Sequence, residues 1–188
     1  MGTTARIEVF LRAAPESLLR RYIALAAIER WNLDDNVSLR VMSMAGTPIV
    51  QEKLPRHDFH WETRRWAEKH ARREFYILTD DDHLILGERW AERAWEQMAA
   101  HPKMGLMSGR SMIAPERLSM AASVGCPCII RKGVLDFSKL SGPANRQDEE
   151  VCAAVLRAGY CVGYLEGCDY IHCGFGLSQV EPKLWLRY

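Results

Sequence analysis

The stretch YILTDDDHLI, residues 76–85, joins an apolar run to three consecutive aspartates. The run EFYILT (74–79) is apolar without alternation, which predicts a parallel strand covered on both faces. Asp80, Asp81 and Asp82 follow it directly, and three adjacent carboxylates repel one another unless a cation lies nearby. Ligands of layered α/β sheets bind beyond the carboxyl ends of the strands, so these aspartates are expected to line a ligand site. The alternative is a solvated loop or a helix start.

Length and composition predict a single domain over residues 1–188. A chain of 188 residues with 48% hydrophobic and 26% charged residues buries a core without needing disulfides. The net charge of +1 gives no argument for nucleic acid or for an anionic membrane. Glu8, Arg12 and Glu16 stand where a signal peptide needs an apolar segment, and no run approaches 18 apolar residues. The expectation is a cytoplasmic protein without a membrane span.

Six cysteines lie in the last third of the chain, at positions 126, 128, 152, 161, 168 and 173. None forms a CxxC pair, the spacing on which strong zinc signatures rest. We therefore expect most of them to be buried thiols rather than ligands of a structural zinc site.

Hydrophobic periodicity predicts alternating strands and helices. Strands are expected at 7–12, 37–46, 74–79, 104–112, 127–135 and 161–167, and helices at 15–31, 59–73, 88–100 and 147–158. Residues 47–58, with two prolines, are expected to form a loop. The order β-α-β-α-β-α predicts an α/β fold with a mostly parallel central sheet and helices on both faces.

Three motifs follow one another along the chain: YILTDDDHLI (76–85), RQDEEVCAAVLRAGY (146–160) and YIHCGFG (170–176). Their content and order resemble the nucleotide-sugar glycosyltransferases of the GT-A fold, family 2-like. YILTDDDHLI is similar to that family's strand ending in Asp-x-Asp, with Asp80 and Asp82 as the outer pair. RQDEEVCAAVLRAGY (146–160) resembles the acidic helix start that supplies the base of the inverting enzymes, which places Asp148 at the base. YIHCGFG (170–176) is similar to the segment whose histidine completes the metal site, here His172.

The resemblance implies a metal-dependent, inverting glycosyltransferase of the hexosyltransferase class. Its donor is a nucleotide-diphosphate sugar and its acceptor carries a hydroxyl group. Carboxylate oxygens suit Mg²⁺ or Mn²⁺, which neutralises the leaving diphosphate, and imidazole favours Mn²⁺. The implied metal ligands are Asp80, Asp82 and His172, the base is Asp148, and the donor contacts are Arg12, Arg65, Asp80 and Asp81.

Each of these residues also has a simpler interpretation. Asp148 and the two glutamates after it could only favour the dipole of their helix, and His172 could be a packed or surface imidazole. The segment ETRRWAEKHARRE (62–74) is most simply a solvated face, although Arg64 or Arg65 could reach a diphosphate. Trp66, Trp90 and Trp95 are expected in the core, and Trp61 could stack on a ligand.

Two other functions remain open. A nucleotidyltransferase uses a similar sheet, but FLRAAPESLL (10–19) has no glycine for a phosphate loop after the first strand. A noncatalytic nucleotide- or sugar-binding module would keep the fold without the chemistry. The second strand ends in MSMAG (42–46), without the acidic residue that often holds the donor's base or ribose, so the nucleotide stays open. So do the sugar, the acceptor and the oligomeric state.

Overall fold

A computed structural model describes residues 7–13, 18–43, 52–53, 59–112, 125–141 and 147–173. The strands are β1 (Ile7–Ala13), β2 (Val37–Ser43), β3 (Glu52–Lys53), β4 (Phe75–Asp80), β5 (His83–Ile85), β6 (Met104–Ser111), β7 (Cys128–Arg131) and β8 (Cys161–His172). The helices are α1 (Leu18–Asn32), α2 (Phe59–His70), α3 (Trp90–Ala100), α5 (Gln147–Arg157) and the short 3-10 helix η1 (Phe137–Lys139).

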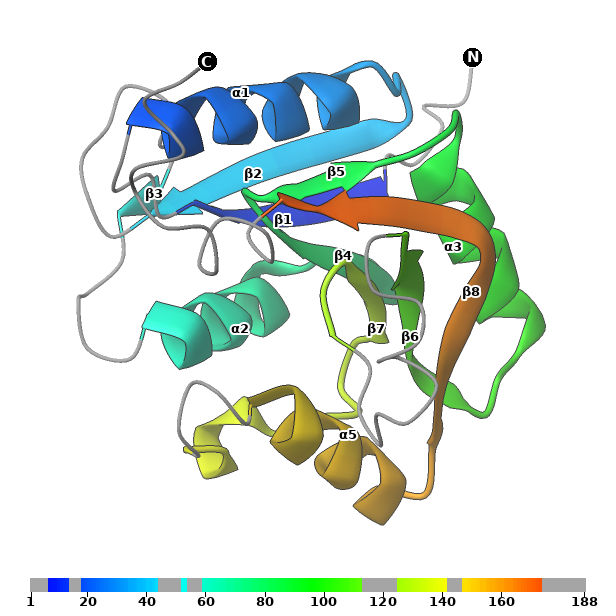
Figure 1. Ribbon diagram of the computed structural model, residues 1–188. Coiled ribbons are helices and arrows are strands. Elements are labelled where there is room, and N and C mark those ends of the chain that lie inside the picture. The colour runs from blue at the N-terminus through cyan, green and yellow to red at the C-terminus, as the bar shows by residue number, and fades with distance from the viewer. Residues whose placement is uncertain are drawn as a thin grey trace.

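The strands form one mixed sheet in the order β3-β2-β1-β4-β7-β6-β8-β5 (Figure 1). The half that begins the chain, β3-β2-β1-β4, is parallel throughout. In the second half β7 runs antiparallel to both its neighbours, β6 and β8 are parallel, and β5 is antiparallel to β8. Six of the eight strands therefore run the same way, and the predicted α/β fold is confirmed.

The core lies on both faces of the sheet, as the unalternating strands predict. In β4, Tyr76 and Leu78 face one cluster, which also contains side chains of α2, α5 and η1. Phe75 and Ile77 face the other cluster, which contains side chains of α1 and α3. Burial on both faces explains why this strand reads as a continuous apolar run.

The tryptophans among the described residues belong to the core, as expected for three of them. Trp90 is 1% exposed and makes an edge-to-face contact with Trp31 at 5.4 Å. Trp66 and Trp95 are partly buried against the two clusters. Trp61 is fully buried in the first cluster, so stacking on a ligand is not its role in this structure.

Two strands were not predicted. β3 lies within the segment expected to be a loop and pairs over only two residues with β2. β5 follows the aspartates directly and is three residues long, too short for any periodicity to indicate it. Such short strands gain their hydrogen bonds from a partner distant in sequence, which local pattern does not reveal.

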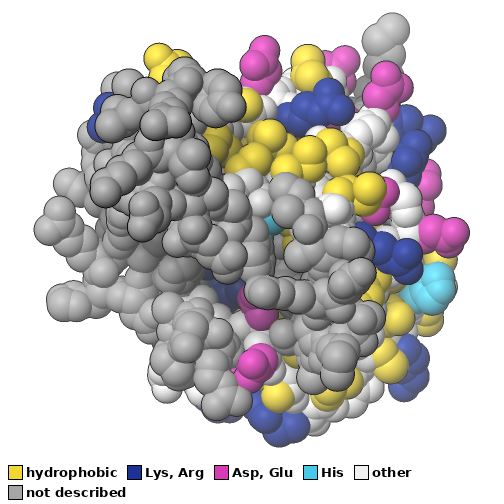
Figure 2. Space-filling model, in the orientation of Figure 1, with side chains coloured by type: hydrophobic (Ala, Val, Ile, Leu, Met, Phe, Trp, Pro, Cys, Tyr) yellow, Lys and Arg dark blue, Asp and Glu magenta, His cyan; other side chains and the backbone are white. Residues whose placement is uncertain are grey.

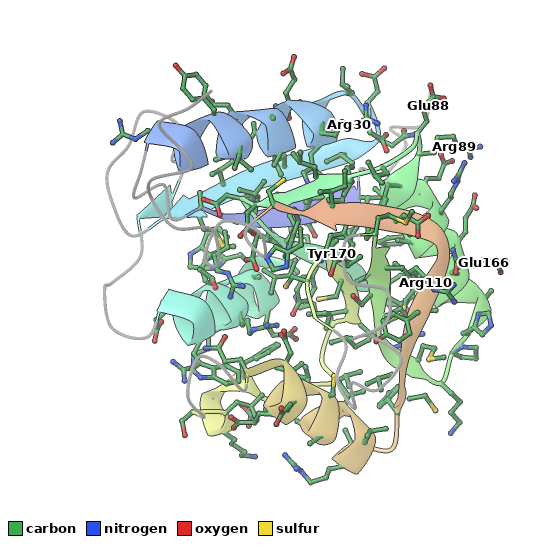
Figure 3. All side chains as sticks on the ribbon, viewed as in Figure 1. Arg30, Glu88, Arg89, Arg110, Glu166 and Tyr170 are labelled. Atoms are coloured by element: carbon green, nitrogen blue, oxygen red, sulfur yellow. The ribbon has the colours of Figure 1, made fainter. Side chains whose placement is uncertain are left out.

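β8 is longer than predicted, and its end pairs with the edge strand β5. The expected strand ended at Gly167, but pairing with β6 continues to Tyr170 after shifts in register, and β5 pairs as far as His172. Gly167 has φ +64°, a conformation that favours glycine, and it breaks the pattern in mid-strand. Figure 3 shows Glu166 at the edge of the molecule and Tyr170 near its centre, and Tyr170 is 6% exposed.

Candidate functional site

The aspartate turn is positioned by pairing at the end of β4. Arg12 of β1 stands opposite Asp80 in the parallel register, and Asp81 N–H donates to the Arg12 carbonyl at 3.0 Å. After this turn the chain enters β5, where His83 stands opposite His172 of β8. Cys173 N–H donates to the Asp82 carbonyl at 2.8 Å, which ties the end of β8 to the turn.

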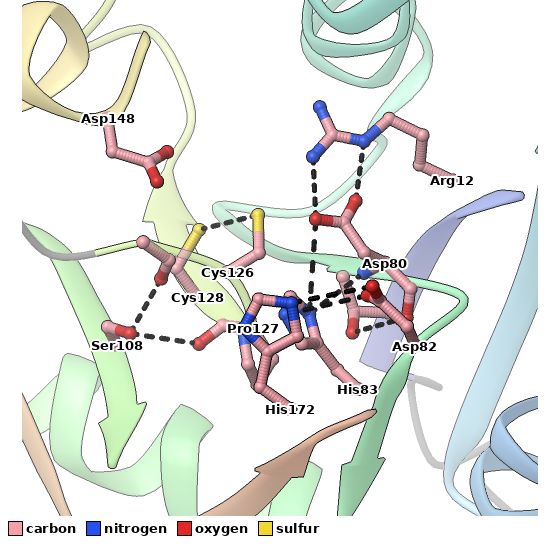
Figure 4. Close-up of polar contacts among 12 residues, drawn as sticks. Arg12, Asp80, Asp82, His83, Ser108, Cys126, Pro127, Cys128, Asp148 and His172 are labelled. Atoms are coloured by element: carbon pink, nitrogen blue, oxygen red, sulfur yellow. Dashed lines mark hydrogen bonds and ion pairs between the residues drawn. The ribbon is translucent and has the colours of Figure 1, made fainter. Parts of the chain in front are cut away.

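Asp82, His83 and His172 form a cluster that could hold a metal ion (Figure 4). One ligand atom from each lies within 4.8 Å of the others, and no other such cluster occurs among the described residues. The Asp82 carboxylate lies between the rings, with Oδ2 3.4 Å from His172 Nε2 and Oδ1 3.8 Å from His83 Nε2. The ring centroids are 4.5 Å apart. The structure thus brings Asp82 and His172 together, as the sequence implied.

His83 is the member of this cluster that sequence reasoning missed. It is 3% exposed, and burial lowers its pKa to about 4 although Asp80 and Asp82 oppose that change. The ring is therefore neutral near pH 7, the form that binds cations. Asp80 N–H donates to His83 Nδ1 at 3.3 Å, so Nε2 carries the proton of the metal-free ring. A cation at Nε2 requires the other tautomer.

Asp82 carries the negative charge of the cluster. Burial alone would raise its pKa, but the hydrogen bond from His172, and the charge that His83 carries once it is protonated in acid, hold the pKa of Asp82 below the ordinary value. A charged carboxylate beside two imidazoles is therefore present at neutral pH.

The Asp80 carboxylate pairs with Arg12, and its Oδ2 also lies 4.0 Å from His83 Nδ1 of the cluster. Arg12 Nε donates to Oδ1 at 2.5 Å and Nη2 donates to Oδ2 at 2.7 Å, so both carboxylate oxygens are paired. Burial opposes the charge of both groups, yet their attraction dominates: the pKa of Asp80 lies well below its ordinary value and that of Arg12 above it. The role of Asp80 as a metal ligand stays a prediction. Asp81, 1% exposed, is buried within the turn.

Asp148 lies in the first turn of α5 and reaches toward the same region (Figure 4). Arg64 of α2 donates from Nη2 to Asp148 Oδ1 at 2.7 Å, and the two side chains are 2% and 47% exposed. Acidic and basic side chains lie together in Figure 2 at the place where α2 and α5 approach each other in Figure 1. The Asp148 carboxylate is thus half-exposed and lies beside the buried guanidinium of Arg64.

The arginine that contacts this region is Arg64, not Arg65. Arg65 donates to the carbonyls of Phe137 at 3.2 Å and Leu140 at 3.0 Å, and it pairs with Glu62. These contacts hold η1 against α2. The donor contact predicted for Arg65 stays a prediction.

The segment 125–128 lies between Asp148 and the metal-ligand cluster in Figure 4. Ser108 Oγ donates to the Gly125 carbonyl at 2.6 Å, and the Sγ atoms of Cys126 and Cys128 are 4.0 Å apart. The hydrogen bond to Cys126 and burial raise the pKa of Cys128 well above its ordinary value, so it is a thiol. All six cysteines are free. Four of them are buried, as expected for most, whereas Cys161 is exposed and Cys173 is half-buried.

The chain matches no protein-family model and no curated protein at a significant level. Its fold is shared with solved structures at low sequence identity. The mannosyltransferase PcManGT of Pyrobaculum calidifontis, in complex with GDP-Man and Mn²⁺, has a TM-score of 0.68 at 13% identity, covering 88% of this chain and 56% of that one. A CMP:2-keto-3-deoxy-manno-octonic acid synthetase complexed with CTP has a TM-score of 0.59 at 11% identity, covering 97% and 100%.

TarS 1–349 of S. aureus has a TM-score of 0.57 at 12% identity, covering 88% of this chain and 59% of that one. The chain spans 50–59% of the length of PcManGT, TarS and the bifunctional IspDF of Campylobacter jejuni. Within the described residues no helix is long and apolar enough to cross a membrane. The fold is thus the one shared by GT-A glycosyltransferases and nucleotidyltransferases.

Proposed function

We propose that the protein is a metal-dependent glycosyltransferase that moves a sugar from a nucleotide-diphosphate donor to an acceptor hydroxyl with inversion. The observation that carries the proposal is the cluster of Asp82, His83 and His172. It lies beyond the carboxyl end of a buried parallel strand, where ligands of such sheets bind. PcManGT, which shares the fold, was solved with GDP-Man and Mn²⁺.

The cluster offers one carboxylate and two imidazoles within 4.8 Å. Mg²⁺ prefers oxygen ligands, whereas imidazole suits Mn²⁺ and the later transition metals, so this donor set favours Mn²⁺. A bound divalent ion supplies Lewis-acid stabilisation of the leaving diphosphate. We assign Asp82, His83 and His172 as its ligands.

Asp148 is the proposed general base. Its carboxylate accepts the proton of the acceptor hydroxyl while the hydroxyl oxygen bonds to the anomeric carbon and the bond from that carbon to the diphosphate oxygen breaks. A base at hydrogen-bond distance contributes typically about 10²–10⁴-fold. The 47% exposure of Asp148 leaves it accessible to an acceptor.

Arg12, Arg65, Asp80 and Asp81 remain our proposed donor contacts. Arg12 uses Nε and Nη2 for Asp80, whereas its Nη1 is buried and has no hydrogen-bond partner within the described residues. A buried unpaired N–H is costly, and a phosphate oxygen of the donor would satisfy it.

A nucleotidyltransferase is the second candidate, favoured by one comparison. The CTP-bound synthetase is matched over 100% of its length, whereas PcManGT is matched over 56%. The two functions differ in their products: sugar transfer releases a nucleoside diphosphate, and nucleotidyl transfer consumes a triphosphate and releases pyrophosphate. A noncatalytic module would bind nucleotide and release neither.

A thermal-shift panel of nucleoside diphosphates and triphosphates, with and without Mn²⁺, tests the proposal. A ligand at 100 times its Kd stabilises the folded state by about 2.7 kcal/mol. For a chain of this size that is roughly 5–10 °C. We expect one diphosphate to give a shift that requires the metal, and its nucleotide-sugar to release that diphosphate. Absence of any shift would sink the proposal, and pyrophosphate release would favour the second candidate.

A further inference from the structure

The contact between Arg64 and Asp148 uses only one arm of the guanidinium fork. Nε and Nη2 of an arginine point from the same edge and together match a carboxylate. Arg64 donates from Nη2 to Asp148 Oδ1, while its Nε is buried and has no hydrogen-bond partner in the part of the chain that the structure describes. The second carboxylate oxygen of Asp148, Oδ2, could accept a hydrogen bond from Nε, but it does not do so in this structure.

The Oδ2 atom of Asp148 instead packs against the backbone of Gly125. A Cβ added to Gly125 would be 2.7 Å from Asp148 Oδ2 and 3.3 Å from its Cγ. No side chain larger than hydrogen fits beside this position of the carboxylate. Ser108 Oγ, which donates to the Gly125 carbonyl at 2.6 Å, anchors that backbone. The absence of a side chain at residue 125 therefore permits the one-armed arrangement.

Resting on the proposed function, we propose that Gly125 and Arg64 are positioning residues that keep the Asp148 carboxylate in this one-armed arrangement. Arg64, 2% exposed, holds Oδ1 and fixes the direction of the side chain. Gly125 leaves room for Oδ2 away from Arg64 Nε. Hydrogen bonds to a carboxylate favour its charged form, so a second bond from Arg64 would make it a poorer proton acceptor. The one-armed contact preserves the basicity that proton transfer needs.

The variant Gly125→Ala tests this directly. Its methyl group would displace Oδ2, and we expect the unpartnered Nε of Arg64 to bind the displaced oxygen. The fold should survive, because Gly125 has no positive φ and the atom that must move ends a side chain. Gly163→Ala on β8 is the matched control, since its methyl group meets only the flexible end of Met104, at 3.1 Å.

The assay is release of nucleoside diphosphate from UDP-glucose, UDP-N-acetylglucosamine or GDP-mannose with Mn²⁺, where water replaces the acceptor and gives its proton to Asp148. We expect Gly125→Ala to lower kcat at least about 10-fold, within the roughly 10²–10⁴-fold share of a general base. The donor KM and the melting temperature should stay at wild-type values. A crystal structure of the variant should show Asp148 paired with both Nε and Nη2 of Arg64.

A second substitution supplies a rescue. Lysine keeps a positive charge but has no fork, so Arg64→Lys in the Gly125→Ala background should recover part of the lost kcat. A kcat within about threefold of wild type in Gly125→Ala, or a crystal structure in which its Arg64 still uses one arm, would overturn the inference. Wild-type protein that releases no diphosphate from any donor would instead overturn the proposed function, and the crystal structure would still decide the role of Gly125.

Discussion

Two arginine–aspartate pairs flank the site, and they differ in how the aspartate is held. Arg12 grips Asp80 with two hydrogen bonds of 2.5 and 2.7 Å, and the side chains are 7% and 20% exposed. Arg64 holds Asp148 with one bond of 2.7 Å, and the side chains are 2% and 47% exposed. Both arginines are buried, so the contrast lies in the carboxylates.

We call Arg12–Asp80 the closed pair, because both carboxylate oxygens accept from the arginine, and Arg64–Asp148 the open pair, because only one does. The two arrangements fit different roles. In the closed pair both carboxylate oxygens accept from one guanidinium, which neutralises a buried charge at the end of β4 and aligns that end with β1. In the open pair an oxygen remains for another partner. We therefore expect the Arg12–Asp80 pair to contribute mainly to stability and Asp148 to contribute to the reaction, a difference that hydrogen-bond geometry indicates where residue type does not.

Removing the reactive carboxylate should give the largest effect. Asp148→Asn keeps the shape of the side chain but accepts no proton, so turnover should fall by about 10²–10⁴. Donor binding should survive. Stability should fall by more than the helix-dipole contribution of about 0.3–1 kcal/mol, because the buried Arg64 loses its charged partner, but by less than the roughly 3–5 kcal/mol of a fully buried pair, because the Asp148 side chain is 47% exposed. Turnover and thermal shift on the same preparation check this.

Glu149→Gln is the matched control, because it removes a neighbouring charge from the same first turn of α5. If the helix dipole is the whole role of these acids, both variants will lose a little stability and keep normal turnover. Turnover by Asp148→Asn within about threefold of wild type would remove Asp148 from the mechanism.

Breaking the closed pair should act on stability instead. Asp80→Asn leaves the Arg12 charge buried without its partner, and breaking a buried pair costs roughly 3–5 kcal/mol. Since Asp80 is 20% exposed, we expect the lower end, about 3 kcal/mol, or roughly 6–12 °C in melting temperature. Unchanged stability in calorimetry would mean that Asp80 is not structural, and would return it to the candidate metal ligands.

The sequence predicted the fold better than the geometry of the site. Strands covered on both faces, such as β4, give long apolar runs, and helices such as α5 carry their own periodicity and an acidic first turn. β5 was not predicted because three residues are too few to show a periodicity. The second half of β8 was not predicted because its pattern is interrupted at Gly167. Those two strands are the pair that sets His83 opposite His172.

The partners in the site were hidden for the same reason. Asp82, His172 and Asp148 could be predicted from the sequence, because aspartate and histidine are residue types that commonly bind metals or transfer protons. Arg64, and not Arg65, contacts Asp148. Which of the two adjacent arginines does so depends on the face of α2 that meets α5, and the sequence does not indicate that face. Gly125 has no local signal at all, since its role appears only when Asp148, distant in sequence, packs against it.

Acid titration of the metal-free protein should separate the contribution of the buried His83 from that of Asp80 and Asp82. The pKa of His83 in the folded protein is about 4, below its ordinary 6.5, so its neutral form favours folding above pH 6.5 and this contribution is lost as pH falls toward 4. The depressed pKa values of Asp80 and Asp82 give a second loss that begins only below about pH 4. We expect the first step to be about 1–3 kcal/mol, since one pKa unit is 1.36 kcal/mol.

His83→Gln should abolish the first step and leave the second, as measured by urea unfolding from pH 7 to pH 3. A wild-type protein whose unfolding free energy stays constant between pH 6.5 and pH 4 would contradict the burial of a neutral His83.

The smallest expected effect concerns which aspartate holds the metal. The Asp82 carboxylate contacts both histidines of the cluster, whereas both carboxylate oxygens of Asp80 accept hydrogen bonds from Arg12. Asp82→Asn should therefore weaken Mn²⁺ binding at least about 10-fold, because even residues that only orient metal ligands are worth roughly 10–100-fold. Asp80→Asn, titrated well below its melting temperature, should stay within about threefold of wild type.

The histidines sharpen the same test, because they carry the preference between ions. Imidazole suits Mn²⁺ and adds little for Mg²⁺, so His172→Ala should weaken Mn²⁺ binding while leaving Mg²⁺ binding nearly unchanged. His83→Gln should do the same if His83 is a direct ligand. Calorimetric titration of both ions into each variant separates the outcomes. Equal losses for the two ions would mean that the histidines only shape the turn, and an Mn²⁺ affinity lost in Asp80→Asn but kept in Asp82→Asn would mean that the closed pair opens when the metal binds.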